Sequence, residues 1–465
     1  MAERATIDVS QIIEQQKLTR FIVGLVAVSA LVTFFDGFDL NVMSFVAPEM
    51  SRALHLSTVT MGNVFSAGLL GTMLGGFIFG YLGDRIGRRL SIILATLSFA
   101  FLTFGLALAR NYEELLILRF IQGIGIGGLL PLCWTLNIDF VPRGYQSTVV
   151  TVLMLGYTFG DSFAGPLSIW FAGYGWPSVF IFGACAALAV TVLLYFFLPE
   201  SIKFLVNKGR SPDLIAKLAR RLAPGRTIDR SDRFVLSGED SQGQKVFRVS
   251  ALFRGKLRWI TPLLWGAFIA SSVAVFLRVS WGPTILESMG YSRDTAAITT
   301  SISSVGSAIG GLLLMRFTDT RGAISIAVFP ALTVPLLLVM GLGKFGGMGF
   351  LVMYFFLTML LVGAHFGVQS ISGIFYPSAH RANGAGWATS VAKFGSVIGP
   401  IVGGHLLATH MPVRRLFAVL AVCPVAVGGG VFALGVIQRR LLRAGAEQRR
   451  APSAPQLGSQ PSMPD

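Results

Sequence analysis

The chain has 465 residues, of which 53% are hydrophobic and only 13% are charged, and its formal net charge is +16. Soluble domains carry about 25% charged residues, so this composition excludes an ordinary soluble globular protein. Apolar runs of roughly 20 residues alternate with short polar breaks along the chain, as in proteins with repeated membrane-spanning helices. The sequence therefore predicts an all-α polytopic membrane protein.

Twelve predicted spans fall into two groups of six. They cover residues 21–47, 60–82, 90–109, 113–137, 146–172, 177–198, 259–283, 295–315, 323–343, 348–375, 384–409 and 414–437. We therefore expect an N-terminal arm over 1–20, six-helix bundles over 21–198 and 259–437, a central loop over 199–258 and a disordered tail over 438–465.

Basic residues are distributed unevenly between the two sides of these spans. Of the 38 Lys and Arg residues, 29 fall in the N-terminal arm, the loops after even-numbered spans and the tail, and six fall in the opposite loops. Loops rich in Lys and Arg remain in the cytoplasm, so we expect both termini to be cytoplasmic. This topology accounts for the positive net charge, and no nucleic-acid partner is expected.

Nothing in the sequence indicates a cofactor, a metal site or an enzyme. Cys133, Cys185 and Cys423 lie within apolar spans at a spacing that matches no metal site or disulfide framework. The polar loops contain no metal-ligand cluster, nucleophile elbow or catalytic His–carboxylate pair. The run QGIGIGG at 122–128 lies inside a span without a preceding strand, so close helix packing explains it better than dinucleotide binding.

The first span contains two acidic residues, Asp36 and Asp39, in the string FFDGFDLNVMSF. A carboxylate at the centre of a membrane helix costs roughly 2.5–3.5 kcal/mol on insertion scales, and the spacing places both on one helical face. Arg119 in the fourth span lies at a similar predicted depth. We expect the three to bind and sense a coupling proton; a buried ion pair that only fixes helix packing is the alternative.

Two further cations lie at membrane depth, Arg278 in the seventh span and Lys393 in the eleventh. An anionic substrate needs a cationic anchor in a low-dielectric site, so both are candidate substrate-binding residues. Packing is the alternative for Lys393, and extension to the outer surface is the alternative for Arg278. Asp161 in the fifth span could pair with a cation, join a proton path or face a hydrated cavity.

Four uncharged side chains complete the candidate substrate-binding set. His365 and Gln369 stand four residues apart on one face of the tenth span. Tyr157 and Trp281 could stack against a substrate ring. A packing role is the alternative for each.

The segment GYLGDRIGRR follows the second span. Its glycines and charged residues form a motif: Gly80, Gly83, Asp84, Arg85, Gly87, Arg88 and Arg89. The matching break in the second half, MRFTDTRG, aligns Asp319 with Asp84 and Gly322 with Gly87, which indicates an eroded internal repeat. The motif, the span number and the long central loop resemble the major facilitator superfamily. The resemblance implies two bundles around a central cavity, with the motif and Asp319 gating its cytoplasmic side.

Finer features resemble the aromatic acid–proton symporter branch of that superfamily. They are DGFD in the first span, RFIQGIGIGGLLP from Arg119, PES at 199–201 and YPSAHRANGAGWATSVAKFGSVIGP at 376–400. The branch usually has Arg where Lys393 stands and Glu where Asp139 stands. The resemblance implies a monomer in the bacterial inner membrane that imports small aromatic carboxylates, such as 4-hydroxybenzoate, together with protons.

Other functions remain open. The segment GYTFGDSFAGP at 156–166 loosely resembles the superfamily's antiporter motif, which favours a proton antiporter that exports amphipathic compounds. A short aliphatic carboxylate also fits a cation-anchored cavity. A non-transporting sensor or membrane scaffold is a third interpretation, against which the aspartate pair and the motif argue.

Overall fold

The structure is a computed structural model that describes residues 6–237, 249–255, 257–321, 323–343, 346–376, 381–409 and 411–450. The first half contains α1 (Val9–Gln15), α2 (Arg20–Ala53), α3 (Thr58–Ile86), α4 (Arg88–Ala107), α5 (Tyr112–Gly127), α6 (Leu129–Ile138), α7 (Arg143–Trp170) and α8 (Trp176–Phe197). The second half contains α11 (Leu257–Ser288), α12 (Arg293–Arg321), α13 (Val328–Leu342), α14 (Gly347–Phe375), α15 (Arg381–Ala408), α16 (Val413–Leu420) and α17 (Val422–Arg450).

In the described part of the chain, 11 helices are long and apolar enough to cross a membrane. Helices α5 and α6 together form one of them, over Tyr112–Ile138. Helix α7, with 28 residues, occupies the place of the fifth predicted span. It is not among the 11 because Asp161 and several Gly, Ser and Thr residues lower its hydropathy. With α7, the arrangement has the twelve membrane helices that the sequence predicts.

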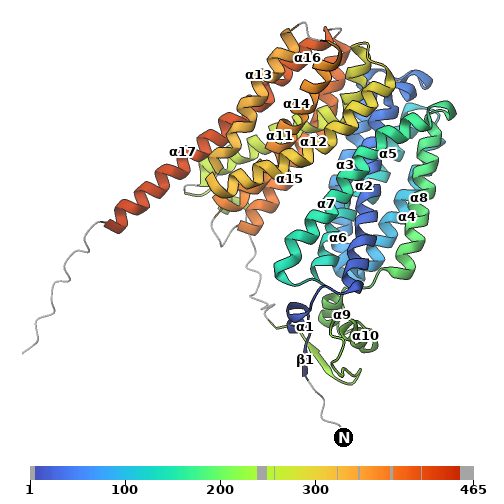
Figure 1. The fold of residues 1–465 in the computed structure, drawn as a ribbon, viewed down its shortest axis with the longest axis vertical. Coiled ribbons are helices and arrows are strands. Elements are labelled where there is room, and N and C mark those ends of the chain that lie inside the picture. The colour runs from blue at the N-terminus through green and yellow to red at the C-terminus, as the bar shows by residue number, and fades with distance from the viewer. Residues whose placement is uncertain are drawn as a thin grey trace, which may run out of the picture.

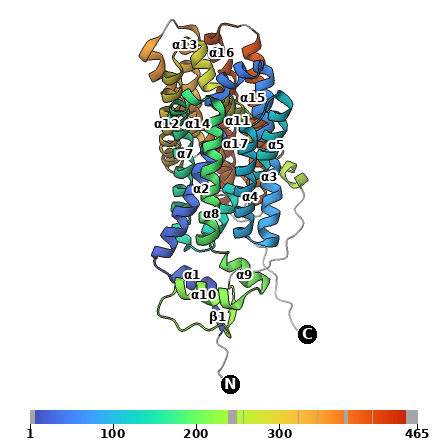
Figure 2. The same cartoon turned by 90° about the vertical axis from the view of Figure 1, so that its right-hand side faces the viewer.

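The helices form two bundles, α2–α8 and α11–α17 (Figure 1). The bundles meet through the helix pairs α3–α15, α7–α12 and α2–α11. They come together toward the end of the molecule where α13 and α16 are labelled and diverge toward the opposite end, beyond which α1, α9 (Ile202–Lys208) and α10 (Pro212–Leu222) lie (Figure 2). We call these two ends the α13 end and the α10 end. Large apolar side chains are exposed along the helices, as at Phe101 (62%) and Phe196 (72%), and such surfaces suit contact with lipid.

The central segment is more ordered than the loop that the sequence predicts over 199–258. Strand β2 (Arg233–Val235) pairs in parallel with β1 (Thr6–Asp8) of the N-terminal arm. Helix α10 begins with Pro212 and has Arg220 and Arg221 in its last turn, which suits both helix ends. Its apolar face packs with α1 in one hydrophobic cluster of buried residues, which includes Ile12, Ile13, Ile215, Leu218 and Leu222.

The C-terminal helix also extends beyond its predicted end. The sequence predicts disorder from 438, whereas α17 continues to Arg450. Residues 438–450 contain Leu, Arg, Gln, Glu and Ala, which favour helix, and the first proline follows at Pro452. The remainder of the predicted tail, 451–465, lies outside the described residues.

Candidate functional site

A cavity of about 390 Å³ lies between the two bundles. The first bundle contributes residues from α2, α3, α5, α6 and α7, and the second contributes residues from α11, α14 and α15. Five of the residues singled out in the sequence line it: Asp36, Tyr157, His365, Gln369 and Lys393. Long-range folding therefore brings together side chains that are as much as 357 positions apart, counted from Asp36 to Lys393.

The bundles are joined at the α13 end of the cavity by contacts that we call the closed seam. Four residue pairs define it: Glu49 with Arg293, Thr58 with Gly404, Phe65 with Trp281, and Ser66 with Val397. The first is a salt bridge of 2.9 Å, and the second and fourth are hydrogen bonds of 3.0 and 2.7 Å. The seam closes the cavity at this end, and the bundles diverge toward the α10 end (Figure 1).

Two predicted substrate-binding residues lie outside the cavity. Trp281 is 1% exposed, and its Nε1 donates a hydrogen bond of 2.9 Å to the carbonyl oxygen of Pro400. Its ring packs edge-on against Phe65 of α3, with 5.4 Å between the ring centroids, so Trp281 belongs to the closed seam. Arg278 is 6% exposed and lines a separate cavity of about 20 Å³ inside the second bundle, beside Tyr354.

Asp39 and Arg119 form a buried ion pair within the first bundle. Arg119 Nη1 lies 3.0 Å from Asp39 Oδ2, and the residues are 4% and 1% exposed, respectively. Gln122 Nε2 donates to Asp39 Oδ1 over 3.1 Å and to Thr103 Oγ1 over 2.7 Å. Both carboxylate oxygens of Asp39 are therefore hydrogen-bonded, which offsets the cost of burying the charge.

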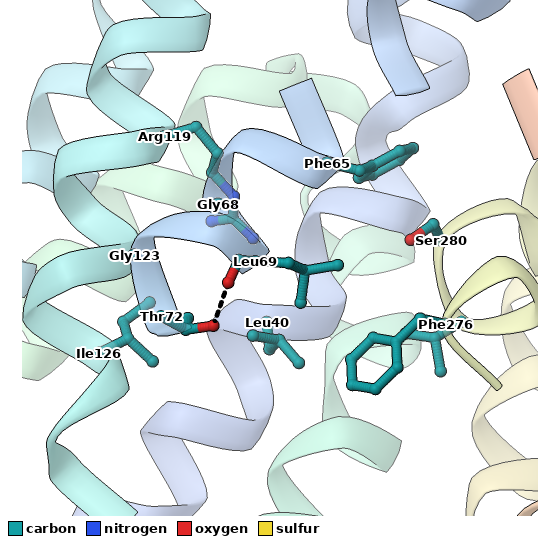
Figure 3. A pocket seen from close by; sticks show the side chains of 11 residues that line it. Leu40, Phe65, Gly68, Leu69, Thr72, Arg119, Gly123, Ile126, Phe276 and Ser280 are labelled. Carbon is teal, nitrogen blue, oxygen red and sulfur yellow. Dashed lines mark hydrogen bonds between the residues drawn. The ribbon is translucent and has the colours of Figure 1, made fainter. Parts of the chain in front are cut away.

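Arg119 lies beside the central cavity. Figure 3 shows its side chain on one side of a small cavity of about 20 Å³, with Phe276 and Ser280 of the second bundle on the opposite side. A Cβ atom at Gly68 would lie 2.9 Å from Arg119 Nε, so the absence of a side chain at Gly68 makes room for the guanidinium. The central cavity and the small cavity share Leu40 and Phe276 in their walls.

Asp36 lies one helical turn from Asp39 but has a different environment. It lines the central cavity and is 3% exposed. Within the described part of the chain it forms no hydrogen bond or ion pair, in contrast to Asp39. Of the two carboxylates, Asp36 is thus the one in direct contact with the cavity.

Lys393 extends from the second bundle toward the first. Its Nζ lies next to Gly76 of α3, where a Cβ atom would be only 3.2 Å away. Lys393 is half-buried in the cavity wall. An ammonium group at this place gives the cavity a positive charge that can attract an anion from solution.

His365 and Gln369 of α14 form a polar strip on the cavity wall. Ser271 Oγ donates to the carbonyl of Phe268 over 3.0 Å and contacts His365 Nδ1 at the same distance. The hydroxyl proton of Ser271 is thus engaged, so we assign the donor role in the second contact to Nδ1–H. His365 Nε2 then accepts from Gln369 Nε2 over 2.8 Å.

Trp134 is a cavity residue that the sequence did not single out. Its Nε1 is buried and has no hydrogen-bond partner among the described residues, and the residue lines the cavity with Leu130 and Pro131. An indole N–H is a donor only, so it can bind an acceptor on a ligand. A helical-face projection of the sequence could have indicated Trp134, because Gly127, Leu130, Pro131 and Trp134 share one face.

The glycine-rich motif connects parts of the first bundle. Gly87 has a φ of +110°, and the Glu200 carboxylate accepts the backbone N–H groups of Arg88 and Arg89 at 2.8 and 3.2 Å. Arg88 Nη1 also forms a salt bridge of 3.0 Å with Asp139. These described contacts stay within the first bundle and the segment that directly follows it, and none of them reaches the second bundle.

The other motif residues make fewer contacts. Asp84 and Arg85 are exposed, and Arg85 Nη1 donates to Tyr81 of the same helix over 2.7 Å. Gly80 has open space around it, and Gly83 packs against Leu132. In the second half Asp319 lies in the last turn of α12, but its side chain, like Gly322, lies outside the described residues.

The chain matches the sequence profile of the Major Facilitator Superfamily over residues 29–400. It belongs to that superfamily. The match confirms the family and the two-bundle fold that the sequence predicts. Members of the superfamily transport solutes across membranes, so the chain is a multi-pass membrane transporter and not an enzyme.

Relatives match along nearly the whole chain. A gallate transporter from Pseudomonas putida is 30% identical over 93% of this chain and 96% of its own length. The 4-hydroxybenzoate transporter PcaK of Acinetobacter baylyi is 28% identical, covering 94% of this chain and 96% of that protein. These relatives agree with the predicted aromatic acid branch of the superfamily.

Solved transporters share the fold at lower identity. The inward open conformation of the xylose transporter XylE from E. coli matches with a TM-score of 0.68 and 17% identity, over 88% of this chain and 95% of that one. A crystal structure of a D-xylose-proton symporter also matches with a TM-score of 0.68 and 17% identity, over 89% and 97% of the two chains. At this identity the likeness supports the fold alone.

Proposed function

We propose that this superfamily member imports small aromatic carboxylates together with protons. The observation that carries the proposal is the cavity of about 390 Å³ with Lys393 in its wall. Its volume suits a small organic molecule, and an ammonium group in a partly desolvated wall attracts a carboxylate. The names of the gallate and 4-hydroxybenzoate transporters support this substrate class.

The remaining cavity residues suit an aromatic ring with polar substituents. Tyr157, Trp134 and Phe276 supply aromatic surface on the walls. Gln369 and the indole N–H of Trp134 offer hydrogen bonds to ring hydroxyl groups. A short aliphatic acid would use Lys393 but would leave much of this aromatic surface without contact.

Transport is proposed to occur by alternating access. The distribution of basic residues supports a cytoplasmic α10 end, and with that orientation the cavity would face inward and the closed seam would face outward. Separation of the closed seam would open the cavity to the outside. Asp84 and Arg85, which are exposed here, would then latch the two bundles at the cytoplasmic side, opposite Asp319.

Proton coupling is assigned to Asp36, Asp39 and Arg119. Asp39 has a guanidinium and an amide as partners, whereas Asp36 faces the cavity without a described partner. A proton that enters from the cavity would therefore reach Asp36 first. Protonation of Asp36 would remove a negative charge beside the Asp39–Arg119 pair. The electrostatic environment of that pair would then depend on whether Asp36 carries the proton.

The first experiment is uptake of labelled 4-hydroxybenzoate into proteoliposomes that contain the purified protein. We expect accumulation with an inside-alkaline pH gradient and only equilibration without it. Gallate, benzoate and short aliphatic acids would be added as competitors, and aromatic acids should compete best. Uptake that is equal with and without the gradient would refute proton symport, and efflux driven by the reversed gradient alone would favour the antiporter.

We further propose a monomer in the bacterial inner membrane with both termini in the cytoplasm. The distribution of basic residues between the two sides supports this orientation. Cysteine labelling with an impermeant reagent, at a residue introduced in the N-terminal arm, tests it. Labelling of intact cells would contradict the assignment.

A further inference from the structure

The small cavity beside Arg119 adjoins both the closed seam and the central cavity. Phe65 lines the small cavity and packs against Trp281 in the seam. Ser280, which directly precedes Trp281 in α11, lines it from the second bundle. The residues that it shares with the central cavity are Leu40, Leu69, Thr72, Ile126 and Phe276. The small cavity therefore lies between the seam and the central cavity.

Arg119 contributes hydrogen-bond donors that its described partners do not use. A guanidinium has five N–H donors. Its Nη1 donates to Asp39 Oδ2 over 3.0 Å and to Gln122 Oε1 over 2.6 Å, and its Nη2 donates to the carbonyl oxygen of Asp39 over 3.5 Å. Nε is buried and has no hydrogen-bond partner among the described residues. A buried charged donor without a partner is costly, so an acceptor next to the guanidinium would be stabilising.

Two hydroxyl groups lie on the other walls of the small cavity. Ser280 is 5% exposed, and its hydroxyl makes no hydrogen bond in the described part of the chain. By contrast, Ser271 and Ser288 on the same helix donate to carbonyls of that helix over 3.0 and 2.8 Å. Figure 3 shows the Ser280 hydroxyl directed toward the cavity. Thr72 Oγ1 donates to the carbonyl of Leu69 over 2.7 Å, which leaves its lone pairs as acceptors.

The size of the small cavity selects the ligand. Its volume is about 20 Å³, whereas a water molecule needs at least about 10–15 Å³ and a buried water typically makes about three hydrogen bonds. The cavity offers three polar partners, Arg119, Thr72 and Ser280, between apolar walls. A water molecule fits this volume and this number of partners, and an organic substrate is too large.

We propose that the small cavity binds a water molecule that accepts a hydrogen bond from the Arg119 guanidinium and bonds to the hydroxyl groups of Thr72 and Ser280. The water links α3 and α5 of the first bundle to α11 of the second. The Asp39–Arg119 pair lies within one bundle, and through this water a change in its charge state acts on the closed seam. That last step rests on the proposed proton coupling, whereas the water site itself does not.

The direct test is a density map of the full chain in the conformation with the closed seam, at a resolution that shows ordered waters. We expect a peak about 2.7–3.2 Å from Ser280 Oγ and from a nitrogen of Arg119. Ser280→Val, which replaces the hydroxyl by methyl groups, should lack the peak. An empty small cavity in a wild-type map that shows other buried waters would overturn the proposal.

The link to the seam is tested by the rate at which the seam opens. Ser66→Cys is introduced into the full chain after Cys133, Cys185 and Cys423 have been replaced by Ala. An impermeant maleimide is added from the α13 side of the reconstituted protein, without substrate. Because Ser66 is 4% exposed and bonded across the seam to Val397, the introduced cysteine reacts only when the seam opens.

We expect Ser280→Ala to raise the labelling rate by about threefold or more, as for the loss of one hydrogen bond, because a water-mediated bond is nearly as strong as a direct one. Thr72→Val should act in the same direction. The matched control is Ser288→Ala, which removes a hydroxyl that bonds to its own helix and should label like the parent.

Labelling of both Ser280→Ala and Thr72→Val at the rate of the control would overturn the link between the water and the seam. If Ser280→Ala does not fold, Thr72→Val decides the test by the same comparison. No substrate is present in either experiment, so failure of the proposal is distinguishable from failure of the proposed transport function.

Discussion

Asp39 and Arg119 form a salt bridge between α2 and α5 in which Oδ2 and Nη1 lie 3.0 Å apart. Both residues belong to the first bundle, and Gln122 bonds to both of them. Rotation of one bundle against the other therefore leaves the pair intact. A change in its charge state, brought about by protonation, is what would alter the pair during transport.

Replacing Asp39 with Asn is expected to uncouple transport from the proton gradient. The amide preserves the size of the side chain but cannot bind a proton, and Arg119 is left without its counter-charge. We expect gradient-driven accumulation to fall by about tenfold or more, the equivalent of about 1.4 kcal/mol, while exchange of labelled for unlabelled substrate persists. Uptake assays in both modes measure this. The control is Asp213→Asn, at an exposed carboxylate in the first turn of α10, and full accumulation by Asp39→Asn would contradict the assignment.

Lys393 is expected to determine affinity for the substrate carboxylate. Loss of a partly desolvated charge pair costs about 2 kcal/mol or more, so Lys393→Ala should raise the KM about 30-fold with a smaller change in the maximal rate. Lys393→Arg keeps the positive charge and should raise the KM by only a few fold. Concentration-dependent initial rates of uptake provide the measurement. Lys208→Ala, at an exposed position of α9, should behave like wild type, and an unchanged KM in Lys393→Ala would rule out the role.

A substitution at Gly76, on α3 of the first bundle, tests the position of the Lys393 side chain, which extends from the second bundle. A Cβ atom there would be 3.2 Å from Nζ, so Gly76→Val should displace the ammonium and raise the KM, by less than Lys393→Ala does. Valine is at least as good a helix former as glycine, so α3 itself should tolerate it. Gly266, which has nothing within 4 Å of a built Cβ, is the matched control. A KM equal in Gly76→Val and Gly266→Val would show that Lys393 does not need this space.

The sequence predicts the membrane helices and the depth of their charges well, because a carboxylate or guanidinium in an apolar run is conspicuous. Depth alone predicts that Asp39 and Arg119 can meet, and the structure brings them together. Depth does not predict the rotation of a helix about its axis. For that reason Trp281 and Arg278 could not be separated from the cavity-lining residues by sequence, although they lie outside the cavity.

Contacts between distant segments were also beyond sequence reasoning. The sequence could have placed Trp134 on one helical face with Leu130 and Pro131, but only the facing bundle shows that this face lines a cavity. Strand β2 pairs with β1 across more than two hundred positions, and three-residue strands carry no detectable alternation. The amphipathic pattern of α10 was the available signal for this region, since Ile215, Leu218 and Leu222 share one helical face.

Asp8 connects the N-terminal arm to the central segment and gives this contact a dependence on acid. Its Oδ1 accepts the backbone N–H groups of Ser10 at 2.9 Å and Ser237 at 3.2 Å. Slight burial acts to raise the pKa of Asp8, but the hydrogen bonds from Ser237 and Ser10 outweigh it and lower the pKa below its usual 3.8. A carboxyl group with a lowered folded-state pKa stabilises the folded arm when ionised.

That contribution is complete above the unfolded-state pKa of 3.8 and is lost as the pH falls through the lower folded-state pKa. We therefore expect amide protection factors in β1 and α1 to decrease as the pH falls below about 4, measured by hydrogen exchange and corrected for intrinsic rates. Asp8→Asn retains a good helix cap but has no carboxyl group to protonate, so its protection should change less over this range. An equal decrease in the wild type and Asp8→Asn would assign the acid sensitivity to another carboxylate.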